Sequence, residues 1–362
     1  MKQYDSMKEV EIHAFEAIQS LLSEIPQMMT ESTQKEQFQG PDQAIDFRFD
    51  MHHAGRPYTL IAEVKRHGQP RHVRNAAYQL RNYLAHQHHR FQPVPLLLAP
   101  YLSPDSRSIC NELGVSYLDL YGNARLTFGS VFIDRAVADK PKSETRSLRS
   151  IFSPKASAIL RAMLQYPKKP WRVTDLADTA NVSLGHVSNV RRALFEREWI
   201  EEHPDGVVLT NPQALLETWR ENYRRPFGQS VKGYTHFHGA KLEDHLRFMP
   251  SDEFDNPRVI CAMNSAAKWI SPFGRDAMNT FYADSYGTKI LKDVLQFSRT
   301  SKGANVTIRT IKDESLFRDA IEPVSGLYCT SPVQTYLDLW NGNERDRESA
   351  QFLAEEYFPW LQ

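Results

Sequence analysis

Residues 156–209 read ASAILRAMLQYPKKPWRVTDLADTANVSLGHVSNVRRALFEREWIEEHPDGVVL, and this stretch decides the fold of the middle of the chain. Apolar residues recur at helical spacing three times along it, which predicts three short helices, with Ser183 placed to cap the third. Two short predicted strands, 200–202 and 207–209, flank the turn sequence HPDG and form a predicted hairpin. The pattern is typical of a helix-turn-helix with a wing.

The third predicted helix carries side chains that suit DNA recognition. Asparagine and arginine make bidentate contacts to adenine and guanine, and a further cation there can reach phosphate. Winged helices also dock proteins, but a basic window leads into this segment and favours DNA. The candidate DNA-binding residues are Ser183, His186, Ser188, Asn189, Arg191, Arg192 and Lys155.

Charge is segregated along a chain of 362 residues that carries 44 basic and 44 acidic groups. Residues 64–104 contain no Asp or Glu, and residues 140–172 hold nine basic groups against Glu144 alone. Clustered cations of this kind form either a phosphate-binding surface or a solvated helix face, and charge alone leaves both open.

The surrounding sequence predicts an α/β and α+β multidomain protein. An amphipathic helix at 7–25 precedes two alternating strands, at 45–51 and 58–65, and a basic helix at 71–87 follows, before further α/β alternation. We therefore expect a first domain at 1–136, a polar linker at 137–150, a winged helix-turn-helix at 151–225 and a mixed α/β C-terminal domain at 226–362.

A possible metal site lies in the first domain. Glu63 and Lys65 are two residues apart, so they leave the same face of a strand, and Asp46 lies on the neighbouring strand. Two carboxylates can hold Mg²⁺ while the lysine orients the attacking water of a phosphodiester hydrolysis. Asp50 is the alternative first acid, and a plain surface pair between Glu63 and Lys65 is the structural alternative.

These residues resemble the PD-(D/E)xK nuclease superfamily. Asp46, Glu63-Val64-Lys65 and the following helix with Gln79 and Tyr83 are similar to its acid, ExK and QxxxY elements. The resemblance implies a restriction-endonuclease-like fold for the first domain, with Asp46 and Glu63 as metal ligands and with Lys65 and Gln79 as catalytic residues if the domain cleaves DNA. This fold is also often kept as a DNA-binding or structural module without activity.

The three-part layout carries a second resemblance. The winged helix, followed by MNSAAKWISPF, GANVTIRT and VSGLYCTSPVQTYLDLW, resembles the AbiEi-type antitoxins. The resemblance implies a transcriptional autoregulator that acts opposite a nucleotidyltransferase-like toxin in a type IV toxin–antitoxin pair. Small members of the family begin directly with the winged helix, whereas this chain adds residues 1–136 before it.

Three functions follow as hypotheses. The first is a sequence-specific regulator and antitoxin that acts against the toxin and needs no cofactor. It would bind double-stranded DNA at an inverted repeat in its own promoter, as a homodimer. The second is a Mg²⁺-dependent endonuclease targeted by its winged helix, and the third is a toxin-sequestering protein. The longest apolar run, at 93–101, is too short for a membrane span, so we expect a cytoplasmic protein without membrane contact.

Overall fold

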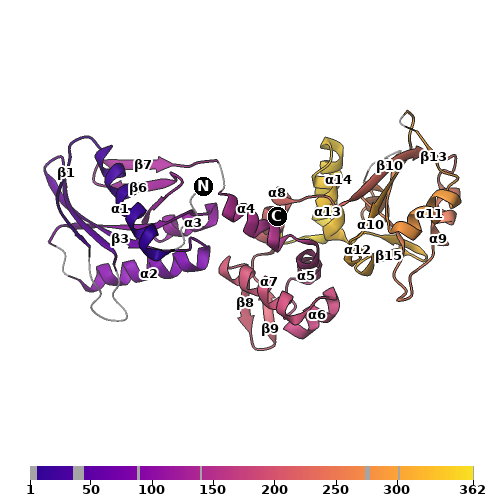
Figure 1. Cartoon of the computed structure of the whole chain (residues 1–362), viewed down its shortest axis with the longest axis horizontal. Helices are drawn as coiled ribbons and strands as arrows, with labels where there is room; N and C mark the ends of the chain where they lie inside the picture. The colour runs from indigo at the N-terminus through magenta and orange to yellow at the C-terminus, as the bar shows by residue number, and fades with distance from the viewer. Residues whose placement is uncertain are drawn as a thin grey trace. The chain divides into compact units, whose positions relative to one another are not determined.

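The computed structural model describes residues 6–35, 45–87, 90–138, 141–273, 278–300 and 302–361. The chain folds into two compact units (Figure 1). The first unit comprises Met1–Ser147 with the segment Phe195–Glu198, and the second comprises Leu148–Leu194 with Trp199–Gln362. Within the described ranges, no helix is long and apolar enough to cross a membrane.

The first unit is built on a seven-stranded sheet whose described strands lie in chain order from one edge to the other. The pairs β3–β4 and β4–β5 are parallel, and the other neighbours are antiparallel. The strands are β1 (Met28–Lys35), β2 (Phe47–His53), β3 (Arg56–Val64), β4 (Gln92–Ala99), β5 (Ser116–Asp119), β6 (Ala124–Phe128) and β7 (Val131–Arg135), and the helices are α1 (Met7–Ser23), α2 (Pro70–His86) and α3 (Pro104–Glu112).

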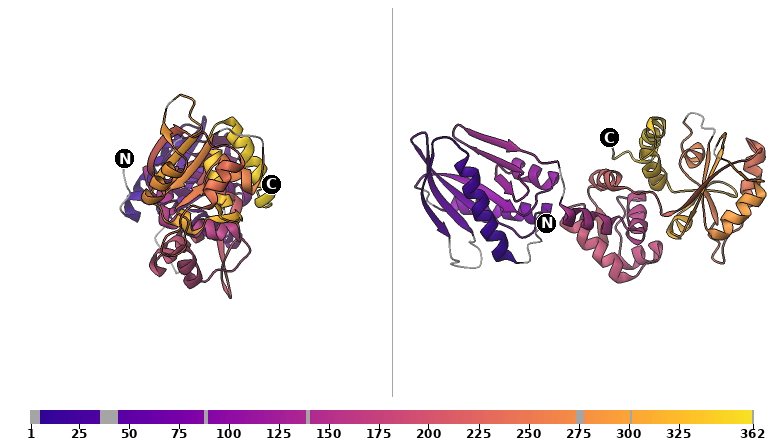
Figure 2. Two further views of the ribbon diagram at one scale, coloured as in Figure 1. Left: turned by 90° about the vertical axis from the view of Figure 1, so that its right-hand side faces the viewer. Right: turned by 45° about the horizontal axis from the view of Figure 1, so that its top comes forward.

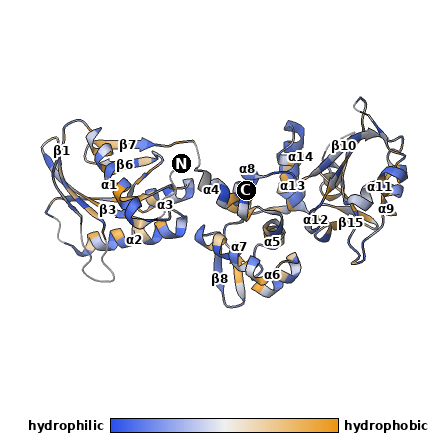
Figure 3. Cartoon of the chain, in the orientation of Figure 1, coloured by the Kyte–Doolittle hydropathy of each residue, from blue (hydrophilic) through white to orange (hydrophobic). Residues whose placement is uncertain are grey.

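Helices cover both faces of this sheet (Figure 2). The apolar side of α1 packs with one face of β2, β3 and β4, whereas α2 and α3 close a second core around Ile61 and Leu97 on the other face. Figure 3 shows both hydrophobic and hydrophilic stretches on α2, as expected of a helix with one buried and one exposed side. The first unit is therefore a three-layer α/β/α arrangement.

The predicted hairpin is present as β2 and β3, which pair antiparallel with Phe47 opposite Ala62. Ala54 and Gly55 both have positive φ, which two-residue hairpin turns require. Sequence analysis missed β1, because its residues, MMTESTQK, are mostly polar. A polar strand of this kind is stable at a sheet edge, where it pairs on one side only and meets water on the other.

The segment 137–150, which we expected to be a linker without regular structure, is largely helical. Helix α4 (Lys142–Ile151) occupies most of it. Leu148 and Ile151 are buried, 3% and 4% exposed. Three residues apart, they lie on one side of the helix, and this short apolar stripe is easy to overlook among the polar residues around it.

The second unit begins with three helices and a hairpin, in the order expected from the sequence. They are α5 (Pro154–Gln165), α6 (Val173–Ala180), α7 (Leu184–Glu196), β8 (Ile200–His203) and β9 (Gly206–Leu209). Asn181 ends α6 in the left-handed conformation, and Ser183 accepts a hydrogen bond from the His186 amide at the start of α7. Val187, Val190 and Leu194 form the buried side of α7.

A second, mixed sheet follows, with the strand order β13-β10-β14-β12-β11-β16-β15 among the described residues. The pairs β12–β14 and β11–β16 are parallel. The strands are β10 (Gly228–Tyr234), β11 (Val259–Cys261), β12 (Asn279–Ala283), β13 (Ser298–Arg299), β14 (Val306–Ile311), β15 (Ile321–Val324) and β16 (Leu327–Cys329), and the helices are α8 (Pro212–Asn222), α9 (Ala240–Arg247), α10 (Asn264–Ile270), α11 (Ser285–Val294), α12 (Ser315–Arg318), α13 (Pro332–Trp340) and α14 (Glu344–Tyr357).

Candidate functional site

Helix α7 exposes most of the side chains that we predicted to contact DNA. Ser183, Ser188, Asn189 and Arg192 are exposed, and His186 and Arg191 are partly exposed. The buried stripe of α7 holds the helix against its neighbours, so these polar residues face outward at its N-terminal half. Lys155 is also exposed, but it lies in the first turn of another helix, α5.

Two arginines of α7 have different surroundings. The Arg192 guanidinium donates to Asn189 Oδ1 at 2.7 Å, so these two exposed side chains form one polar group. Arg191 instead donates to Glu202 Oε1 on β8 at 2.8 Å. Among the described residues, the other N–H donors of the Arg192 guanidinium have no partner, whereas Arg191 must leave Glu202 before it can bind phosphate.

The acidic site of the first unit lies where β2 begins and β3 ends. Asp46 precedes β2 and its Oδ2 accepts a hydrogen bond from the Val64 amide at 2.6 Å. Lys65 Nζ lies 2.6 Å from Glu63 Oε1. Among the described residues, no hydrogen-bond partner reaches the buried Oε2 of Glu63. The sheet therefore brings Asp46, Glu63 and Lys65 together, as the sequence predicts.

The alternative acid, Asp50, is engaged elsewhere. Its Oδ1 accepts from the Thr59 hydroxyl at 2.7 Å, and Arg48 lies 3.3 Å away. Gln79 is exposed on α2, and no hydrogen bond between described residues joins it to Glu63. Of the two acids, Asp46 is the one whose charge acts on Glu63.

Burial raises the pKa of Glu63 to about 7, and the charge of Asp46 adds to this, although Lys65 opposes it. Glu63 is only 2% exposed, because Ile61, two residues earlier on the same face, belongs to the core beneath α2 and α3. Glu63 is thus partly protonated near neutral pH when no cation is bound, and a divalent cation that binds it must displace a proton.

The raised pKa of Glu63 makes the stability of the first unit depend on pH. The folded unit holds a proton that the unfolded chain releases above about pH 4.5, so stability should fall as the pH rises from about 4.5 to about 7. The expected loss is about 3 kcal/mol in EDTA, measured by hydrogen exchange of peptides from β2, β3 and β4. Glu63→Gln should flatten this dependence, and an unchanged slope in that variant would contradict the assignment.

A buried polar cluster in the second unit was missed by sequence analysis. Asp338 is fully buried, and its carboxylate accepts hydrogen bonds from Tyr223, Tyr282 and Gln334. Burial raises the pKa of Asp338 despite these donors. The only signal in the sequence is an acidic residue within the apolar run YLDLW at 336–340, which does not reveal its partners.

The same cluster reaches helix α5. Arg161 is 2% exposed, and its guanidinium binds Asp319, donates to Ser315 Oγ at 2.8 Å and lies 3.5 Å from Gln334 Oε1. Gln334 also donates to Asp338, so hydrogen bonds run from Asp338 in α13 to Arg161 in α5. These contacts tie the helix–hairpin segment to the second sheet within one unit.

Comparisons with known proteins find a match for the C-terminal part of the chain. Residues 208–359 match a family model described as a transcriptional regulator, AbiEi antitoxin, of a type IV toxin–antitoxin system. None of the curated proteins matches the chain. A solved structure titled "Structure of EndoMS in apo form" is similar at 17% identity and a TM-score of 0.20, over 33% of this chain and 48% of the other. The similarity thus spans about half of that structure's length.

Proposed function

We propose that this chain, whose residues 208–359 carry an AbiEi-type antitoxin domain, is a sequence-specific DNA-binding regulator and the antitoxin of a type IV toxin–antitoxin pair. The match to a family of regulators and antitoxins carries the proposal. Its partners would be double-stranded DNA in its own promoter and a nucleotidyltransferase-like toxin. No cofactor is needed for either role.

The helix–hairpin segment α5 to β9 supports the DNA-binding part of the proposal. We interpret it as a winged helix, with α7 as the recognition helix, β8 and β9 as the wing, and the exposed pair Asn189 and Arg192 as the base-reading group. Ser183, His186 and Ser188 would lie along the same groove, and Lys155 would bind phosphate. A homodimer would read an inverted repeat with two such helices.

The ion pair between Arg191 and Glu202 predicts a gain of affinity. Both side chains are substantially exposed, so the pair is weak and Glu202 mainly withholds Arg191 from phosphate. Glu202→Gln should raise the affinity for promoter DNA by about 3- to 10-fold, more at low salt, in a fluorescence anisotropy titration. Glu201→Gln removes the same charge from the other side of β8 and should raise the affinity for DNA less. Equal gains of affinity in the two variants would contradict the role of Arg191.

Co-expression tests the antitoxin role. The toxin encoded beside this chain should arrest growth when expressed alone, and growth should recover when this chain is expressed with it. Recovery with the variant Asn189→Ala/Arg192→Ala would separate neutralisation of the toxin from DNA binding. Growth arrest that persists in the presence of the wild-type chain would contradict the proposal.

A second candidate function is a Mg²⁺-dependent endonuclease. The buried Glu63 Oε2, which has no hydrogen-bond partner among the described residues, favours it, because Mg²⁺ binds such carboxylate oxygens. In the described ranges, no group of three or more His, Cys, Asp and Glu residues could hold a metal ion. Asp46 and Glu63 would therefore be the protein ligands, and water would fill the other coordination positions of Mg²⁺. Lys65 would position the attacking water, and Gln79 would support the site. Bound Mg²⁺ would activate that water and stabilise the developing charge.

Plasmid cleavage distinguishes the two functions. If the first unit is an endonuclease, wild-type protein should nick a supercoiled plasmid that carries its own upstream region in Mg²⁺ or Mn²⁺, and EDTA should abolish the activity. Glu63→Ala and Lys65→Ala should be inactive, whereas Asp50→Asn should keep activity. A plasmid that is bound but never cut would exclude the endonuclease and leave the regulator.

A further inference from the structure

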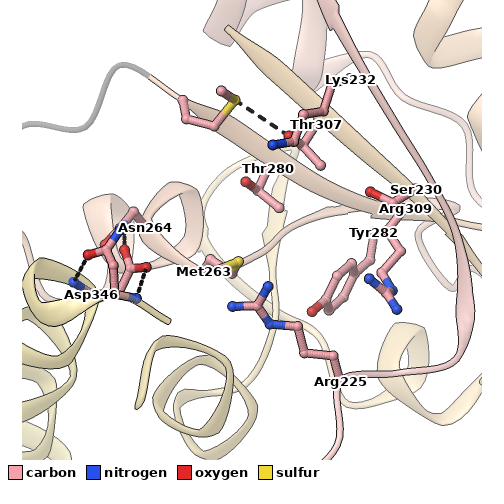
Figure 4. A pocket seen from close by; sticks show the side chains of 12 residues that line it. Arg225, Ser230, Lys232, Met263, Asn264, Thr280, Tyr282, Thr307, Arg309 and Asp346 are labelled. Atoms are coloured by element: carbon pink, nitrogen blue, oxygen red, sulfur yellow. Dashed lines mark hydrogen bonds between the residues drawn. The ribbon is translucent and has the colours of Figure 1, made fainter. Parts of the chain in front are cut away.

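A pocket of about 320 Å³ opens on one face of the second sheet (Figure 4). Its floor comes from three adjacent strands, β10, β14 and β12. Strand pairing sets Lys232, Thr307 and Thr280 in one row across these strands. The next row, two residues along, holds Ser230, Arg309 and Tyr282. Because alternate residues of a strand share a face, all six side chains belong to the same side of the sheet.

The pocket is positively charged. Arg225 joins Lys232 and Arg309 in its wall, and no ion pair links these three cations to a carboxylate anywhere in the described chain. Arg309 donates to the Pro226 carbonyl at 2.7 Å and Arg225 to the Asn341 carbonyl at 3.4 Å, so backbone contacts hold both guanidiniums. The buried Asp338 interacts with Arg225 through its charge but forms no ion pair with it among the described residues. Three cations around one hollow repel one another unless an anion lies between them.

The one carboxylate that lines the pocket, among the described residues, is already engaged. Asp346 Oδ1 accepts from the side-chain Nδ2 of Asn264, and Asp346 Oδ2 accepts from the Asn343 backbone N–H at 3.0 Å as part of the capping box of α14. Figure 4 shows Asp346 and Asn264 together on one side, with Arg225 reaching toward the middle of the pocket. The acid therefore stabilises a helix start and leaves the three cations available to a ligand.

The remaining residues of the pocket indicate what else a ligand contains besides an anionic group. Met263 and Met278 supply thioether side chains beside the hydroxyls of Ser230, Thr280 and Thr307. Tyr282 also borders the pocket, but it is 1% exposed and its hydroxyl donates to Asp338. Guanidinium and hydroxyl groups recognise phosphate, whereas methionine side chains contact flat aromatic groups. A pocket near the lower end of the size range of small-molecule sites fits one nucleotide better than two.

We propose that this pocket binds a nucleoside monophosphate or a phosphorylated molecule of similar size. Its phosphate would lie between Arg225, Lys232 and Arg309, and its base would lie against Met263 and Met278. The site is separate from α7, and it would give the chain a small-molecule ligand in addition to DNA and toxin.

Calorimetric titration of the full chain tests this inference. AMP, GMP, CMP and UMP are the probes, with adenosine, inorganic phosphate and a 5′-phosphorylated oligonucleotide for comparison. At least one monophosphate should bind at least 10-fold more tightly than adenosine and than inorganic phosphate. Equal affinity for inorganic phosphate, or tighter binding of the oligonucleotide, would overturn the assignment to a free nucleotide.

Lys232→Gln provides the decisive variant. The Lys232 side chain is exposed and makes no hydrogen bond or ion pair with the described residues, so its replacement should not disturb folding. We expect it to weaken nucleotide binding by 10-fold or more. Lys241→Gln removes a charge that is also exposed, on α9 and outside the pocket, and should leave nucleotide affinity unchanged. No detectable binding of any monophosphate at millimolar concentration, or the same affinity in Lys232→Gln, would overturn the proposal.

Discussion

Replacing Asn189 and Arg192 together by alanine should lower the affinity of the chain for its own promoter by about 100-fold, since each base-reading side chain contributes about 1–3 kcal/mol. The two side chains already hydrogen-bond to each other, which orients the Arg192 guanidinium before DNA arrives. Each single variant should therefore lose more than half of the binding free energy that the double variant loses. Fluorescence anisotropy with a labelled promoter duplex measures all three affinities.

Lys289→Ala is the matched control for this experiment. Lys289 is an exposed cation on α11 in the same unit, so its loss changes the net charge as Arg192→Ala does. It should leave the affinity for the promoter unchanged. If the double variant on α7 kept wild-type affinity and the same salt dependence, α7 would not be the recognition helix.

Asp319→Ala should destabilise the second unit by about 3–5 kcal/mol. It leaves Arg161 buried with only neutral partners, Ser315 and Gln334, and an unpaired buried charge is costly. The chain suits the measurement well, because all six tryptophans lie between residues 171 and 360, within the second unit. Urea unfolding followed by tryptophan fluorescence should therefore report this unit alone.

A double variant controls for lost contacts. Arg161→Leu/Asp319→Ala removes both charges, and an apolar side chain in place of Arg161 leaves no buried charge behind. It should be clearly more stable than Asp319→Ala. If the double variant were the less stable of the two, the loss of stability in Asp319→Ala would not come from an unpaired Arg161 charge, and this would contradict the account.

Local patterns in the sequence were enough to predict much of this fold. Strand β2 follows from its alternation of apolar and polar residues, whereas β3 is buried at every position from Tyr58 to Val64 and lacks the alternation that we expected. Helix α7 follows from its apolar stripe and the Ser183 cap. The close approach of Asp46, Glu63 and Lys65 was predictable for the same reason, because strand periodicity and one tight turn fix which residues face each other.

Features that depend on distant partners were not predictable in this way. Asp338 meets Tyr223 and Tyr282 from segments that lie 115 and 56 residues away in the chain. The cationic pocket likewise depends on the strand order of the second sheet, in which β14 lies between β10 and β12. A single sequence does not reveal such pairings, since each contributing residue looks like an ordinary polar position.

Promoter binding tests the central claim most directly. The affinity of the full chain for a duplex from its own upstream region is compared with that for a shuffled duplex of the same composition, at physiological salt. The account predicts that the upstream duplex binds at least about 1,000-fold more tightly, as sequence-specific regulators do. Equal affinities with the same salt dependence would mean that the chain binds DNA only through its charge, and this would contradict the proposed role as a sequence-specific regulator.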